Sequence, residues 1–178
     1  MRKVILGVTG SIAAYKAGDI IRRLQDCSCD VTVIMTKEAE AFITPLTLAS
    51  LSGKAVYHNF LDANAQAPTM SHISLAREAD ALLIAPATAN IIGKLACGLA
   101  DDLLTCTVVS TKAPIIIAPA MNDEMYQNKI VQENCKKLKS FGIHFIDPVK
   151  GKLACGTAGV GHLAEAGDII NAVEKILR

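Results

Sequence analysis

The first 35 residues place an apolar run, a glycine turn, a helix and a second apolar run in succession, and this order limits the fold more than any other feature. Residues 4–8 form the first run and lead into the turn 9–11. Residues 13–25 follow with apolar side chains at helical spacing, and residues 31–35 are rich in β-branched residues. Because a helix that joins two strands in this way leaves them parallel, we expect a parallel sheet.

The same alternation continues to the end of the chain. Further strands are expected at 55–57, 81–85, 114–118 and 143–146, and helices at 37–42, 45–52, 90–97, 102–110, 128–141 and from 167 onward. Thr36 is expected to cap the helix that begins at residue 37. Residues 58–71 and the glycine-rich residues 151–161 are expected to form loops.

The composition agrees with a sheet that is covered on both faces. Hydrophobic residues make up 51% of the chain but aromatic residues only 4%, so that Val, Ile, Leu and Ala carry the apolar content. We therefore predict a doubly wound α/β fold, an open parallel sheet in a Rossmann- or flavodoxin-like three-layer sandwich. The length predicts one domain over residues 1–178.

Charge and cysteine spacing argue against several classes of protein. Eighteen Lys and Arg residues balance 17 Asp and Glu residues, so no nucleic-acid partner is expected. No stretch approaches the roughly 20 apolar residues of a membrane span, so no membrane partner is expected either. The start of the chain resembles a signal peptide only superficially, because Thr9-Gly10-Ser11 breaks its apolar run. A cytoplasmic protein is predicted. The six cysteines contain no C-x-x-C motif, so no metal site is predicted.

Four informative segments follow predicted strands, at residues 9–12, 86–90, 119–126 and 151–163. In an open α/β sheet, ligands bind at the carboxyl ends of the strands. We therefore expect these four segments to converge on one site.

The turn that contains Gly10 and Ser11 leads directly into a helix, whose free backbone N–H groups can hold a phosphate. The turn matches neither the dinucleotide nor the P-loop motif, so a single phosphate suits it best, and a simple tight turn is the alternative. In the segment 86–90, which includes Thr88, the backbone amides and Asn90 could contact a ring or a phosphate, or the segment could only cap a helix. Asn122 could donate to a carboxylate or could be a turn residue.

Two further side chains could take part in chemistry. His72 has the ordinary properties of a general base, although a lone histidine is more often structural. Cys155 lies in the last glycine-rich segment, where it could act from a loop that closes over a ligand or could be a small apolar filler.

Four segments, taken in order, resemble the homo-oligomeric flavin-containing cysteine decarboxylases over essentially the whole chain. They are GVTGSIAAYK at 7–16, APATANIIGKLACGLADDLL at 85–104, PAMNDEMY at 119–126 and GKLACGTAGVGHLAE at 151–165. The resemblance implies FMN as the cofactor. The positions that would contact FMN are Gly10, Ser11, Thr36, Phe42, Pro86, Ala87, Thr88, Ala89 and Asn90.

The resemblance also implies the reaction, which is decarboxylation of 4′-phosphopantothenoylcysteine to 4′-phosphopantetheine in coenzyme A biosynthesis. FMN would oxidise the substrate to a thioaldehyde, CO2 would leave, and the resulting ene-thiol would be reduced again. His72 would be the base, Asn122 would hold the substrate carboxylate, and Cys155 would donate a proton. Met121 and Gly156 would contribute to the substrate site.

The family further implies a homotrimer or an assembly of trimers, with FMN at a subunit interface. Because the chain ends soon after the decarboxylase segments, ligation with cysteine is not expected. Three positions depart from the family pattern: Ile91 stands in place of Thr, Tyr126 in place of Trp and His162 in place of Arg. These departures concern substrate contacts more than the class of chemistry.

Three alternatives share this fold. The first is a peptidyl-cysteine oxidative decarboxylase, which would lack the reductive step. The second is an FMN prenyltransferase, which would need neither Asn122 in this setting nor Cys155. The third is a non-enzymatic regulatory FMN-binding subunit, which would tend to have lost one of the catalytic residues.

Overall fold

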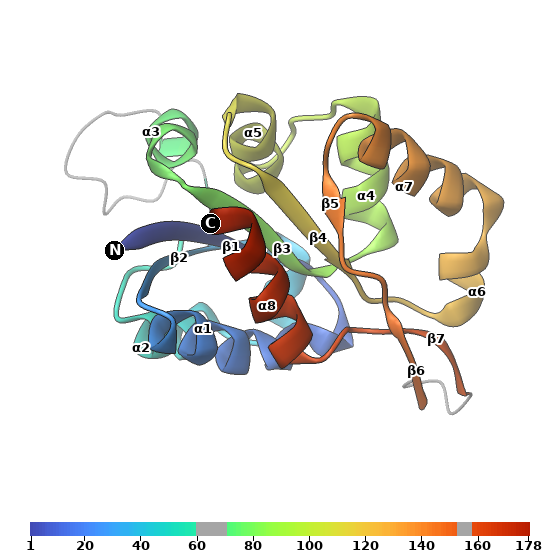
Figure 1. Cartoon of the computed structure of the whole chain (residues 1–178), viewed down its shortest axis with the longest axis horizontal. Helices are drawn as coiled ribbons and strands as arrows, with labels where there is room; N and C mark the ends of the chain where they lie inside the picture. Colours follow the sequence, from blue (N-terminus) through green and yellow to red (C-terminus); the bar gives the residue numbers. More distant parts are fainter. Residues whose placement is uncertain (60–70, 153–157) are drawn as a thin grey trace.

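The computed structural model describes residues 1–59, 71–152 and 158–178. A five-stranded parallel sheet runs through its centre in the order β2-β1-β3-β4-β5 (Figure 1). The strands are β1 (Arg2–Val8), β2 (Cys29–Met35), β3 (Ala81–Ala87), β4 (Ile115–Pro119) and β5 (His144–Phe145). This is the strand order of flavodoxin-like doubly wound sheets, and it confirms the predicted fold class.

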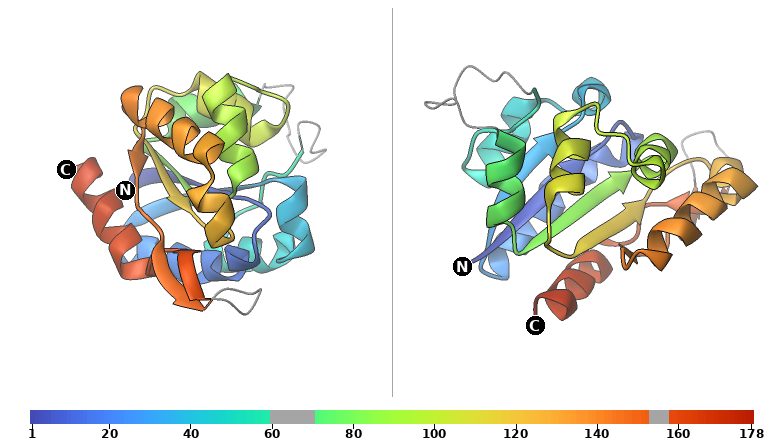
Figure 2. Two further views of the ribbon diagram at one scale, coloured as in Figure 1. Left: turned by 90° about the vertical axis from the view of Figure 1, so that its right-hand side faces the viewer. Right: turned by 90° about the horizontal axis from the view of Figure 1, so that it is seen from above.

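Helices cover both faces of the sheet (Figures 1 and 2). Helices α1 (Ala17–Asp26), α2 (Pro45–Ser52) and α8 (Ala166–Leu177) lie on one face, and α3 (Ser71–Glu78), α4 (Ala89–Cys97), α5 (Leu103–Ser110) and α7 (Lys129–Ser140) on the other. The shorter elements are the 3-10 helices η1 (Ile12–Lys16) and η2 (Lys37–Ala41) and the helix α6 (Asp123–Gln127).

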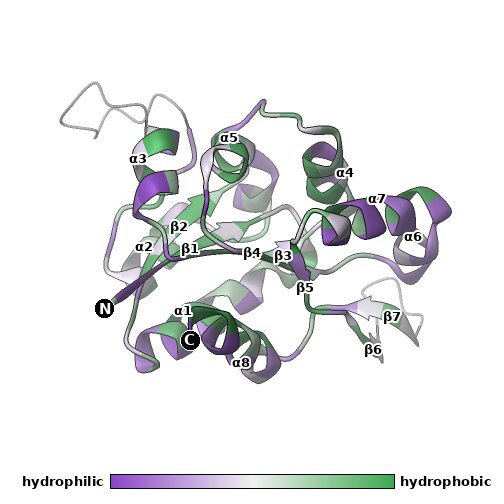
Figure 3. Ribbon diagram, turned by 45° about the horizontal axis from the view of Figure 1, so that its top comes forward, coloured by the Kyte–Doolittle hydropathy of each residue, from purple (hydrophilic) through white to green (hydrophobic). Residues whose placement is uncertain are grey.

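The alternation of side chains along the strands divides the core into two layers. Val4 and Leu6 of β1 pack with α1 and α8, whereas Ile5 between them packs with α4 and α5. Every residue of β3 is buried, as expected for the central strand of a covered sheet. Figure 3 shows the central strands as mostly apolar, while the helices carry apolar and polar residues on different sides.

Three local predictions were wrong in part. The helix expected at 13–25 is divided into η1 and α1, and the strand expected at 55–57 is reduced to one bridge between Ile34 and Tyr57. The loop expected at 151–161 is instead bordered by β6 (Val149–Lys152) and β7 (Ala158–His162), an antiparallel pair. Glycines suggested a loop there, but Gly159 and Gly161 occupy β7, where they approach other residues closely. Within the described ranges, no helix is long and apolar enough to cross a membrane.

Candidate active site

Hydrogen bonds join the turns that follow β1 and β3. The buried Thr9 hydroxyl donates to the carbonyl oxygen of Pro86 at 2.7 Å and accepts from the backbone N–H of Thr88 at 3.1 Å. The Ala85–Pro86 peptide bond is cis. One side chain therefore fixes the first turn against the start of α4, which brings together two of the four segments expected to converge.

The other two segments join the same edge. The backbone N–H of Ala120 donates to the carbonyl of Ala87 at 3.0 Å, and that of Met121 donates to the carbonyl of Gly161 at 3.0 Å. Backbone hydrogen bonds thus join the turn after β4 to β3 on one side and to β7 on the other. The predicted convergence at the carboxyl edge of the sheet is confirmed for the described part of each segment.

Gly161 and Gly159 permit the hairpin to lie against the turn after β4. A Cβ atom at Gly161 would overlap the carbonyl oxygen of Met121, and one at Gly159 would overlap the side chain of Asp123. These glycines serve close packing of β7 and not the freedom of a loop.

The Gly161→Ala variant is therefore expected to lose about 1–3 kcal/mol of stability, because the added methyl group must displace the backbone at Met121. Thermal unfolding measures this loss. Gly167→Ala is the matched control, since a Cβ atom at Gly167 meets no atom within 4 Å. Equal melting temperatures for the two variants would contradict the close approach.

A cavity of about 310 Å³ opens where the turns meet. Its size falls within the range of about 300–1,000 Å³ that is usual for small-ligand sites. The described residues that line it are Thr9, Gly10, Ser11, Thr36, Glu38, Thr88, Ala89, Asn90, Ile91, Asp102, Ala120, Met121 and Met125. Six of the positions expected to contact a cofactor and one expected to contact substrate are among them.

Thr36 differs from its predicted role as a helix cap. It occupies the position before η2, but its side chain makes no capping hydrogen bond. Within the described residues, its buried hydroxyl oxygen has no hydrogen-bond partner. A buried hydroxyl that borders a cavity and lacks a partner is a group that a polar ligand could satisfy.

The glycine turn supplies further polar groups to the cavity lining. The Ser11 hydroxyl accepts from the backbone N–H of Ala13 at 3.3 Å and so caps η1, which continues directly into α1. A Cβ atom at Gly10 would lie only 2.5 Å from Cβ of Glu38. Glycine at this position therefore keeps the turn and η2 close together and leaves the cavity open.

Thr88 and Asn122 both cap helices. Thr88 accepts from the N–H of Ile91 at 3.3 Å, and Oδ1 of Asn122 accepts from the N–H groups of Glu124 and Met125 at 2.9 and 3.3 Å. The helix-capping role considered for Thr88 is thus confirmed, whereas Asn122, considered as a turn residue, is the N-cap of α6. Because Oδ1 of Asn122 serves the cap, its amide N–H groups are the part of the side chain suited to a carboxylate.

Several expected site residues lie elsewhere. Pro86 and Ala87 are buried and are not among the described lining residues, and Phe42, directly after η2, is 45% exposed. His72 is the second residue of α3 and partly buried, and it is not among the described residues that line the cavity. Asn122 is not among them either, although it directly follows the lining residue Met121. Cys155 and Gly156 lie outside the described residues.

The cavity lining also contains residues to which no individual role was assigned from the sequence: Thr9, Ala120 and Met125, which lie within segments expected at the site, and Glu38 and Asp102, which lie outside those segments. The sequence could have indicated two of them, since Thr9 is a polar residue between an apolar run and a helix and Asp102 is an acidic residue at the start of a predicted helix. It could not have indicated Glu38, because an exposed glutamate near a helix start is common on protein surfaces.

Two of the positions that depart from the family pattern make contacts outside the cavity. The Tyr126 side chain is half-buried, and burial, with a smaller contribution from Asp147, raises its pKa to about 12. His162, at the end of β7, places Nε2 3.0 Å from Nζ of Lys16 in η1. Ile91, the third departure, lines the cavity and is almost fully buried.

The fold and the site define a parallel α/β domain with a small-ligand cavity at the carboxyl edge of its sheet. The chain belongs to the flavoprotein family, whose model matches residues 1–178. It is 44% identical over 177 residues to the coenzyme A biosynthesis bifunctional protein CoaBC of Vibrio vulnificus (strain YJ016). That match covers 99% of this chain but 44% of the relative, so the chain spans less than half of that protein's length.

Solved structures share the whole fold. A cysteine-to-serine mutant of a PPC decarboxylase, complexed with pantothenoylaminoethenethiol, is 34% identical and superposes with a TM-score of 0.87. That match covers 98% of this chain and 97% of the other. The FMN-dependent cysteine decarboxylase SpaF is 29% identical with a TM-score of 0.85, and the match covers 99% of this chain and 95% of that one.

Proposed function

We propose that this chain binds FMN in the cavity and decarboxylates 4′-phosphopantothenoylcysteine to 4′-phosphopantetheine, a step of coenzyme A biosynthesis. One observation carries the proposal: six residues that match the family's cofactor positions line a single cavity at the carboxyl edge of the sheet. Similarity to a PPC decarboxylase and to a bifunctional coenzyme A biosynthesis protein supports this substrate.

The described residues fit a flavin mononucleotide. The turn at Gly10 and Ser11 leads into a helix and is suited to a single phosphate. The unpartnered Thr36 hydroxyl can donate to the same group or to the ribityl chain. Ala89 and Met121 offer apolar surface for a ring, and Asn90 offers an exposed amide.

When bound, FMN supplies the electron sink, because it can accept a hydride from the carbon that bears sulfur and later return it. We propose that the amide of Asn122 holds the substrate carboxylate and aligns the bond that breaks. His72 would take the proton of the substrate thiol, and Cys155 would give a proton to the carbon that CO2 leaves. The net reaction consumes no external oxidant.

The position of His72 supports an assembly in which subunits share sites. His72 does not belong to the described cavity lining of its own chain. Apolar side chains are exposed in η1, directly after the glycine turn, and in α2, with Ile12 at 59%, Tyr15 at 62% and Leu46 at 76%. We propose that a second copy covers this surface and brings its own His72 to the cavity, within a homotrimer or an assembly of trimers.

A mixing experiment tests the shared site. His72→Asn and Asn122→Asp chains, each nearly inactive alone, are expected to recover about a quarter of wild-type activity after co-refolding in equal amounts, the value for random assembly. Native mass measurement gives the number of subunits. A mixture that stays inactive although the chains co-assemble would show that both residues serve the same subunit's site.

Flavin binding tests the cofactor directly. The purified protein is expected to be yellow, and denaturation is expected to release FMN and not FAD. Titration of protein stripped of its cofactor should show FMN binding more tightly than riboflavin, because the turn at Gly10 contacts the phosphate. A protein that takes up neither flavin would refute the proposed function.

A further inference from the structure

The charged residues in the described cavity lining are both carboxylates, Glu38 and Asp102. Glu38 is exposed to solvent at the cavity edge, whereas the Asp102 side chain is only 28% exposed. An FMN phosphate is itself anionic, and a partly buried carboxylate in the same cavity repels it more strongly than an exposed one. The charge of Asp102 therefore needs to be offset close by.

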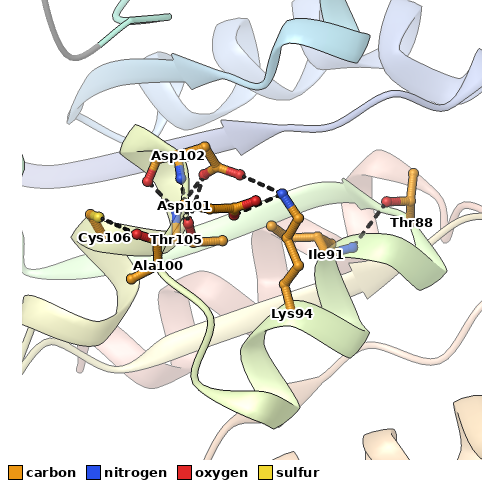
Figure 4. A network of polar contacts seen from close by, with 8 residues as sticks. All are labelled: Thr88, Ile91, Lys94, Ala100, Asp101, Asp102, Thr105 and Cys106. Atoms are coloured by element: carbon orange, nitrogen blue, oxygen red, sulfur yellow. Dashed lines mark hydrogen bonds and ion pairs between the residues drawn. The ribbon is translucent and has the colours of Figure 1, made fainter.

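Lys94 supplies that offset from the neighbouring helix α4 (Figure 4). Its ammonium Nζ lies 3.1 Å from Oδ2 of Asp102 and 2.8 Å from Oδ1 of Asp101. The Lys94 side chain is 21% exposed, so solvent screens these contacts only in part. The hydrogen bond with Asp101, together with that to Asp102, raises the pKa of Lys94, which keeps the ammonium charged.

The remaining carboxylate oxygen of Asp102 is also fixed. Oδ1 accepts from the backbone N–H of Thr105 at 2.8 Å and from its hydroxyl at 2.9 Å, and the backbone N–H of Asp102 donates to the same hydroxyl at 3.1 Å. This capping box starts α5 without any contribution from Lys94. The two carboxylate oxygens of Asp102 thus have separate roles: Oδ1 caps α5 and Oδ2 forms the ion pair with Lys94.

We propose that Lys94 is a positioning residue for the cofactor: it holds the Asp102 carboxylate in the cavity wall and neutralises it, so that an anionic flavin can bind. The inference rests on the proposed function, since it concerns FMN. A purely mechanical tie between α4 and α5 would instead affect the stability of the fold and would act equally on charged and uncharged ligands.

The test compares flavin binding by four proteins stripped of cofactor. Lys94→Met removes the charge and keeps a long apolar side chain. It is expected to weaken FMN binding about tenfold at low ionic strength, to weaken binding of phosphate-free riboflavin much less, and to approach wild-type affinity in 0.5 M salt. Fluorescence quenching of each flavin measures the dissociation constants, and thermal unfolding shows that each protein is folded.

The second mutation distinguishes charge from structure. Asn caps helices as well as Asp does, so Lys94→Met combined with Asp102→Asn keeps the cap but removes the unbalanced charge. This double variant is expected to bind FMN within about twofold of wild type. Asp101→Asn is the control, because the 60% exposed Asp101 lies outside the described lining and its loss leaves the pair of Lys94 and Asp102 in place.

Each outcome decides one claim. If wild type binds FMN and Lys94→Met binds it equally well, Lys94 has no role in cofactor binding and the inference fails while the proposed function stands. If Lys94→Met weakens FMN and riboflavin alike, or if Asp102→Asn gives no rescue, the effect is mechanical and the inference fails again. If wild type binds no flavin, the proposed function fails together with it.

Discussion

Cys155→Ser is expected to reduce formation of 4′-phosphopantetheine about a thousandfold while CO2 is still released in a single turnover. A thiol has a pKa near 8.5 and can protonate the ene-thiolate left by decarboxylation, whereas a serine hydroxyl is far too weak an acid. The decarboxylated ene-thiol, which has two hydrogens fewer than 4′-phosphopantetheine, should therefore be the released product. Mass spectrometry of the product, together with measurement of CO2, separates the two half-reactions.

The chain contains a matched control for this variant. Cys97 stands in a second copy of the sequence Gly-Lys-Leu-Ala-Cys-Gly, at 93–98, and is exposed at the end of α4. It is not among the described residues of the cavity, so Cys97→Ser is expected to retain wild-type turnover. Normal formation of 4′-phosphopantetheine by Cys155→Ser would show that another group donates the proton.

Asn122→Asp is expected to lower kcat/KM about 10²- to 10³-fold without loss of stability. The aspartate can still cap α6 by accepting from the N–H groups of Glu124 and Met125, since Asp and Asn are equally good caps. It replaces amide donors with a carboxylate, however, and so repels the substrate carboxylate that the amide is proposed to hold. Steady-state kinetics and thermal unfolding measure the two effects separately.

Asn128 provides the corresponding control. Its Oδ1 caps α7 by accepting from the N–H of Ile130 at 2.9 Å. Asn122 directly follows the lining residue Met121, whereas neither chain neighbour of Asn128 is among the described residues of the cavity lining. Asn128→Asp makes the same chemical change at a cap without reaching the site, so its kcat/KM should equal that of wild type. If Asn122→Asp also turned over normally, Asn122 would be a helix cap and no more.

The parallel sheet could be predicted because strands buried on both faces leave a plain pattern of apolar runs separated by amphipathic helices. The place of the site followed as well, since polar turns after parallel strands meet at one edge. The hydrogen bonds from Thr9 to Pro86 and from Met121 to Gly161 hold these turns together at that edge.

Other features depend on contacts between distant residues and left no local pattern. Gly161 and Gly159 suggested a flexible loop, but their lack of a side chain allows β7 to approach Met121 and Asp123. The hydroxyl of Thr36 was expected to cap η2, yet it is buried at the cavity without a partner among the described residues. Neither outcome can be deduced without knowing which backbone lies opposite.

The ion pair between Lys94 and Asp102 could not be predicted from the sequence for a similar reason. Both residues stand within the segment at 85–104 that carried the family resemblance, but a Lys and an Asp eight positions apart on successive helices predict no contact. The turn between α4 and α5 brings Nζ of Lys94 within 3.1 Å of Oδ2 of Asp102. Only the folded chain shows that a cavity carboxylate has a cation beside it.

The most direct test of the central claim is the stoichiometry of turnover by the purified, FMN-loaded protein supplied with 4′-phosphopantothenoylcysteine. The account predicts one CO2 and one 4′-phosphopantetheine for each substrate consumed, over many turnovers and without oxygen, because the flavin returns its hydride within each cycle. Failure to release CO2, or release of CO2 with only the oxidised ene-thiol as product, would contradict it.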